Sequence, residues 1–153
     1  MNKQILILLV AFISVTTFGQ TAAKRAAEFN LEKKVAIQGY DPVAYFTQKK
    51  AVKGKAAIAT THDGVIYNFS SQANKELFLK NPSAYEPQYG GWCAYAMGDN
   101  GDKVEINPET FKIVDGKLNL YYNAFFNNTL KSWNKDEAGL KKKADTNWKK
   151  IIN

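Results

Sequence analysis

The stretch Asn81–Met97 reads Asn-Pro-Ser-Ala-Tyr-Glu-Pro-Gln-Tyr-Gly-Gly-Trp-Cys-Ala-Tyr-Ala-Met and contains the single cysteine of the chain, Cys93. Two prolines, a glycine pair and four aromatic residues surround that cysteine. Prolines interrupt helices and glycines permit sharp turns, so the stretch predicts a sharp entry into a short helix from Trp92 to Met97, which Gly98 would end. Cys93 would then lie in the first helical turn, where unpaired N–H groups favour the thiolate. An active site, a ligand pocket and a packed corner of the core all remain open.

Two Asp-Gly pairs outside this stretch predict β-hairpins. Asp63-Gly64 separates residues 56–61 from 65–69, and Asp115-Gly116 separates residues 111–114 from 118–122. These runs are rich in β-branched and aromatic residues, and Asp-Gly is a strong signal for a two-residue hairpin turn.

Helix signals fill the rest of the chain. Ser70 or Ser71 can cap a helix through Lys80, with Leu77 and Phe78 facing the core together with Ala73 or Asn74. Two C-terminal helices are expected, with apolar stripes formed by Phe126, Leu130 and Trp133 and by Leu140, Ala144, Trp148, Ile151 and Ile152. The order of elements predicts a single small α+β domain, with antiparallel hairpins packed against short helices over residues 39–153.

A second candidate site surrounds Asp41. Asp41 can cap a helical turn, because Pro42 suits the first helical position, where its missing N–H costs nothing. A ligand or a general base is the alternative interpretation of the same carboxylate.

The N-terminal residues have the order of a secretory signal peptide. Lys3 precedes the apolar run Ile5–Ile13, and small and polar residues follow to Gln20. The run is too short to span a bilayer, so residues 1–20 predict a cleaved signal, and residues 21–38 a lead-in helix that Gly39 ends. We expect a soluble exported product, periplasmic or secreted, without stable membrane insertion after signal removal.

Composition limits the remaining classes. The net charge of +7 is distributed over dispersed lysines, which indicates solvated surfaces and no nucleic-acid partner. A lone cysteine cannot form an internal disulfide, so Cys93 is a free thiol, an intermolecular partner or a ligand.

Three motifs together resemble one family. Residues 39–46 read Gly-Tyr-Asp-Pro-Val-Ala-Tyr-Phe, residues 67–71 read Tyr-Asn-Phe-Ser-Ser, and residues 87–94 read Pro-Gln-Tyr-Gly-Gly-Trp-Cys-Ala. In this order they resemble the exported YHS-domain proteins, a subgroup named for including selenoproteins. The likeness extends over nearly the whole chain after the signal.

The resemblance also implies where a metal would bind. Metal-handling members of the wider family carry cysteines at the positions that correspond here to Ala44, Ser70 and Asn74. All three thiols are absent, although soft metal ions prefer thiolate or imidazole ligands.

Three functions follow as hypotheses. The first is a non-catalytic exported binding module for a small ligand, whose pocket is lined by Tyr40, Asp41, Tyr45, Tyr89, Trp92 and Cys93. The second is a copper- or zinc-handling protein that uses Cys93 and His62, with Asp41 as a further candidate ligand. The third is a thiol-dependent redox protein or enzyme, in which His62 would have to activate Cys93. The sequence assigns no catalytic residue, cofactor or oligomeric state, and a transition metal is the one cofactor that it raises.

Overall fold

Both Asp-Gly pairs form two-residue turns between antiparallel strands in the computed structural model, which describes residues 18–153. The first turn joins β3 (Lys55–His62) to β4 (Val65–Phe69), and the second joins β5 (Asn107–Val114) to β6 (Lys117–Tyr121). All four turn residues have φ between 45° and 81°, the left-handed region that such turns require. Both predicted hairpins are confirmed.

The strands form three small sheets. The largest has the order β1-β2-β4-β3, where β1 is Leu31–Glu32 and β2 is Val35–Ala36. Only β2 and β4 run parallel in it. β5 pairs with β6, and β7 (Asn123–Ala124) pairs with β8 (Asn127–Asn128).

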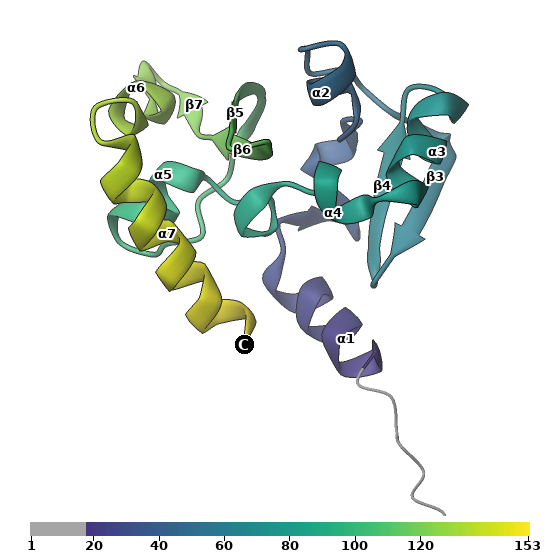
Figure 1. Cartoon of the computed structure of the whole chain (residues 1–153), viewed down its shortest axis with the longest axis horizontal. Helices are drawn as coiled ribbons and strands as arrows, with labels where there is room; N and C mark the ends of the chain where they lie inside the picture. Colours follow the sequence, from purple (N-terminus) through teal and green to yellow (C-terminus); the bar gives the residue numbers. More distant parts are fainter. Residues whose placement is uncertain (1–17) are drawn as a thin grey trace, which may run out of the picture.

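Helices pack around these sheets on two sides (Figure 1). The described helices are α1 (Phe18–Glu28), α2 (Ala44–Thr47), α3 (Gln72–Lys80), α4 (Pro82–Tyr85), α5 (Ala94–Asp99), α6 (Thr129–Trp133) and α7 (Glu137–Ile152), with 3₁₀ turns at Ile37–Gly39 and Gln88–Gly91. In Figure 1, α2 and α3 accompany the β3–β4 hairpin, whereas α5, α6 and α7 gather beside β5 and β6. The chain is a single small α+β domain, as predicted.

The buried side chains form two clusters. The first joins the β3–β4 hairpin to β6 through residues such as Tyr67, Phe78 and Leu120. The second joins α5, α6 and α7 through residues such as Met97 and Trp133. The stretch Asn81–Met97 supplies residues to both clusters and therefore connects the two sides of the domain.

The segment before Gly39 differs from the prediction. The helix predicted for residues 21–38 ends at Glu28, and a small hairpin of β1 and β2 follows it. The helix is fixed to the body by Arg25, which pairs with Glu86, and by the Glu28 carbonyl, which accepts a hydrogen bond from Trp92 Nε1 at 2.7 Å. It is therefore a built-in element of the domain.

The signal-peptide prediction falls mainly on residues 1–17, which lie outside the described residues. Over residues 18–153, no helix combines the length and the apolar character that a bilayer span needs.

The helix predicted for Trp92–Met97 begins two residues later and ends beyond Gly98. Cys93 is the residue before the first turn of α5, not a member of that turn, and its side chain caps no N–H group. Gly98 lies inside α5, where a Cβ would come within 2.5 Å of the Leu140 carbonyl oxygen. Its role is close packing against α7 instead of helix termination.

Two apolar residues lie outside the core that they were expected to join. Phe126 belongs to the β7–β8 turn and is fully exposed, because the predicted helix begins only at Thr129. Leu77 on α3 is 36% exposed, whereas Phe78 and Asn74 are buried as predicted. Of the stripe predicted on α7, Leu140 and Ala144 are buried, Trp148 and Ile151 are partly buried against the same cluster, and Ile152 is half-exposed.

Candidate functional site

The Asp41 carboxylate is fully buried and accepts hydrogen bonds on both oxygens. Oδ1 accepts from the backbone N–H groups of Val43 (2.9 Å) and Ala44 (3.3 Å), as expected of a capping carboxylate. The helix α2 itself begins at Ala44, two residues later than the predicted start at Pro42. Oδ2 accepts from the Ser70 N–H (2.8 Å), the Ser70 hydroxyl (2.6 Å) and Asn74 Nδ2 (2.7 Å). Five donors compensate a buried charge that would otherwise be costly. Asp41 therefore acts as a junction between α2, the end of β4 and α3.

The three positions at which the resemblance expects cysteines meet at this carboxylate. Ala44 donates its backbone N–H to Oδ1, whereas Ser70 and Asn74, which lie four residues apart in sequence, donate from their side chains to Oδ2. Ser70 and Asn74 also contact each other, through a 3.3 Å hydrogen bond. The Asp41 carboxylate thus contacts all three positions, two of them through side chains.

Cys93 lies in the first core cluster and is fully buried. Its Sγ accepts the backbone N–H of Tyr122 at 3.3 Å and lies 3.3 Å from the Thr129 hydroxyl oxygen. Because the Thr129 hydroxyl donates its one hydrogen to the Tyr122 carbonyl at 3.0 Å, the thiol must be the donor to Thr129. The thiol thus links the residue before α5 to Tyr122 after β6 and to Thr129 in α6.

The tyrosine hydroxyls of the predicted pocket are also bonded within the protein. Tyr45 is fully buried and donates to the Pro108 carbonyl at 2.9 Å, and burial raises its pKa well above the ordinary value. Tyr89 donates to Asp145 Oδ1 at 2.9 Å, and burial followed by the Asp145 charge raises its pKa. Both hydroxyls are therefore neutral donors in fixed contacts.

Five of the six predicted pocket residues are distributed between the two core clusters, and Asp41 belongs to neither. Tyr45 and Cys93 belong to the first cluster, with Tyr40 packed against it, and Tyr89 belongs to the second, with Trp92 packed against it. Tyr40 is half-buried, with the Lys53 ammonium 4.7 Å from its ring centre. The structure thus places these residues at a junction of two cores, with Asp41 enclosed in its own set of donors.

His62 lies apart from Cys93 and Asp41 in its contacts. Its side chain is 33% exposed, with Nε2 3.5 Å from Asp63 Oδ2, and its ring meets the edge of Phe78. Within residues 18–153, no group of three or more His, Cys, Asp and Glu side chains is arranged to hold a metal ion. The predicted ligands Cys93 and His62 therefore belong to no such group.

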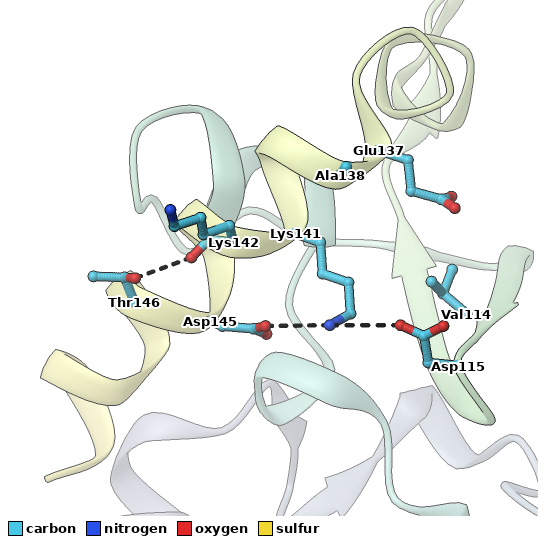
Figure 2. Close-up of a pocket in the computed structure, with 8 residues that line it drawn as sticks. All are labelled: Val114, Asp115, Glu137, Ala138, Lys141, Lys142, Asp145 and Thr146. Atoms are coloured by element: carbon cyan, nitrogen blue, oxygen red, sulfur yellow. Dashed lines mark hydrogen bonds and ion pairs between the residues drawn. The ribbon is translucent and has the colours of Figure 1, made fainter.

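Sequence reasoning missed a groove of about 620 Å³ between the β5–β6 turn and α7 (Figure 2). It is lined by Val114, Asp115, Glu137, Ala138, Lys141, Lys142, Asp145 and Thr146. Lys141 Nζ lies between Asp145 Oδ2 at 3.4 Å and Asp115 Oδ2 at 3.6 Å. In the sequence, the lysines of this region indicated only a solvated surface. Asp115 indicated only a hairpin turn.

One wall of the groove is fixed by Glu137. Its Oε2 accepts hydrogen bonds from Lys112 Nζ at 2.5 Å and Trp133 Nε1 at 2.8 Å. The Lys112 hydrogen bond is the main reason that the pKa of Glu137 lies below its ordinary value. The carboxylate therefore stays ionised at the groove edge.

Tyr121, which packs against Trp133 behind Glu137, has a buried hydroxyl without a hydrogen-bond partner. In the part of the chain that the structure describes, Tyr121 Oη is the one buried side-chain N or O atom that makes no hydrogen bond. Burial raises the pKa of Tyr121, and the Glu137 charge is the next largest cause. The ring packs edge-on against Trp133, with 5.6 Å between ring centres. The hydroxyl is a neutral donor held near the groove.

Comparison of the chain with protein families, with curated proteins and with solved structures found no match.

Proposed function

We propose that this protein is an exported, YHS-like binding module without catalytic activity, and that its ligand site is the groove between the β5–β6 turn and α7. One observation carries the proposal. The two groups best suited to chemistry, the Asp41 carboxylate and the Cys93 thiol, are both fully buried and hydrogen-bonded within the chain.

A nucleophilic thiol needs a base within reach and access for its substrate. Cys93 instead donates to the Thr129 hydroxyl, while the sole histidine is paired with Asp63 and Phe78. The contacts of Cys93 are therefore those of a structural residue that joins α5 to β6 and α6.

The YHS-like part of the proposal is supported by Ala44, Ser70 and Asn74. The side chains of Ser70 and Asn74 and the backbone N–H of Ala44 all donate to the Asp41 carboxylate. Since they meet at Asp41, the resemblance is consistent with the folded chain. In this protein the hydrogen bonds between Asp41 and its donors stabilise the positions at which the metal-handling members carry thiols.

The groove favours a small ligand that carries both an amine and a carboxylate. It presents the lysines Lys141 and Lys142 together with the acids Asp115, Glu137 and Asp145. The ion pairs of Lys141 are long, and Asp115 is 76% exposed, so these contacts contribute little stability and can be exchanged for ligand groups. Amino acids and short peptides have the matching pair of charges.

A thermal-shift screen with free amino acids and dipeptides tests the ligand class. A ligand that binds only the folded state raises the unfolding temperature, and the increase grows with the logarithm of ligand concentration above Kd. We expect at least one zwitterion to stabilise the wild type, and the shift to disappear in Lys141→Met. The control Lys80→Met removes an exposed lysine from α3 and should keep the shift. If no zwitterion stabilises the wild type, or if Lys141→Met responds equally, the groove is not this site.

A further inference from the structure

The β7–β8 hairpin ends in two phenylalanines that contact no core. Phe125 is 91% exposed and Phe126 is 112% exposed. Exposure of both rings to water leaves a large apolar area that no protein contact covers. Single exposed apolar residues are common, whereas an adjacent aromatic pair at a protruding tip is not.

The backbone conformation makes this choice of residues costly to folding. Phe125 has φ 49° and Phe126 has φ 65°, the left-handed values of a two-residue hairpin turn. Bulky L-residues are strained there, and Asn-Gly or Asp-Gly are preferred. Lys33 and Lys34 form a similar turn, but their polar ends suit the water that they face. Neither turn geometry nor core packing therefore explains the phenylalanines.

The surroundings of the tip are polar and free of paired charge. Asn123, Asn127 and Asn128 form the strands beside it. Lys131 and Lys135 follow in and after α6, are exposed, and have no acidic partner within residues 18–153. In Figure 1, β7 and α6 lie together at a corner remote from α1 and from the C-terminus.

We propose that Phe125 and Phe126 insert into the surface of a lipid bilayer with anionic headgroups and hold the exported protein there reversibly. A protruding apolar tip needs no shaped pocket in a fluid bilayer, and amide side chains suit the headgroup layer beside it. The unpaired lysines and the net positive charge, which is +7 for the whole chain and +6 without Lys3 of the predicted signal, add attraction to anionic lipid. Weak hydrophobic anchors require such a second signal. The proposal is independent of the groove.

Vesicle co-sedimentation tests this with processed protein purified from the exported fraction, so that the apolar run Ile5–Ile13 does not contribute. The probes are vesicles of phosphatidylcholine alone and of phosphatidylcholine mixed with phosphatidylglycerol. The wild type should bind the mixed vesicles, and bind less as salt is raised. Phe125→Asn/Phe126→Gly installs the preferred turn, so it should bind at least about tenfold more weakly while its unfolding midpoint is equal or higher.

Two further variants separate the tip from general stickiness. Leu79→Ser removes an apolar side chain that is 53% exposed on α3, and should bind as the wild type does. Lys131→Glu/Lys135→Glu should weaken binding to the mixed vesicles alone. The proposal is overturned if the wild type ignores the mixed vesicles or if the Asn-Gly variant binds as tightly. The proposal is also overturned if light scattering shows a dimer for the wild type and a monomer for the Asn-Gly variant. The tip would then be a contact with a second copy of the chain.

Discussion

The Ser70 hydroxyl donates a 2.6 Å hydrogen bond to the fully buried carboxylate of Asp41, which lies 29 residues earlier in the chain. This contact joins the end of β4 to the start of α2. The same oxygen accepts from Asn74, so one charge fixes three elements. The Asp41 carboxylate is therefore expected to contribute strongly to stability, without any role in catalysis.

Asp41→Asn should destabilise the protein by about 3 kcal/mol, because an amide offers one acceptor oxygen and turns an N–H₂ group toward other donors. Urea unfolding measures the change. Glu76→Gln on α3 is the control and should lie within about 0.5 kcal/mol of the wild type, since Glu76 is exposed. An equally stable Asp41→Asn would show that the five hydrogen bonds do not stabilise the fold.

The triple variant Ala44→Cys/Ser70→Cys/Asn74→Cys tests the family resemblance. Because all three positions contact the Asp41 carboxylate, three thiolates there should bind one Zn(II) or Cu(I), in competition with a chelator. The metal-free variant should be less stable than the wild type, and the metal should restore its unfolding midpoint. A folded triple variant that binds no metal would count against the resemblance and the placement alike.

Two tyrosines allow a matched comparison of how much a buried hydroxyl contributes to the free energy of unfolding. Tyr45→Phe removes a hydroxyl that bonds the Pro108 carbonyl, and should cost about 1 kcal/mol or more. Tyr121→Phe removes the unpartnered hydroxyl, and should be neutral or stabilising. Urea unfolding of both variants gives the comparison. A larger loss in Tyr121→Phe would mean that this hydroxyl has a partner, such as an ordered water.

Acid should weaken the contact between Lys112 and Glu137. The pKa of Glu137 is lowered in the folded state from its ordinary value of 4.5, chiefly by the hydrogen bond from Lys112. The contribution is complete above pH 4.5 and is lost as the pH falls through the lower folded-state pKa. Lys112→Met should therefore lower stability at pH 7 slightly and flatten its decline below pH 4.5. Parallel stability curves for both proteins would contradict this assignment.

Local turn and cap chemistry in the sequence predicted much of the fold. Asp63-Gly64 and Asp115-Gly116 determine their own turns, and Ser71 caps α3 by accepting the Asn74 N–H, so these elements were predictable. The residues around Phe126 were not, because an apolar stripe at helical spacing does not show that Phe125 and Phe126 adopt left-handed values. The helical spacing of apolar residues therefore predicted a helix where the chain forms the β7–β8 hairpin.

The candidate site was less predictable than the fold. Asp41 as a cap could be inferred locally, but its contacts with Ser70 and Asn74 depend on tertiary packing. The groove joins Asp115 in a turn to Lys141 on α7, a pairing that no local pattern contains. The importance given to Cys93 came from its uniqueness in the sequence, and burial assigns it a packing role.

The rate at which iodoacetamide alkylates Cys93 tests whether this residue is a structural thiol in a non-catalytic module. We expect folded protein to be labelled only as fast as it opens, and the labelling rate to increase when urea promotes opening. Fast stoichiometric labelling of the folded protein at neutral pH, independent of urea below the unfolding transition, would contradict the claim.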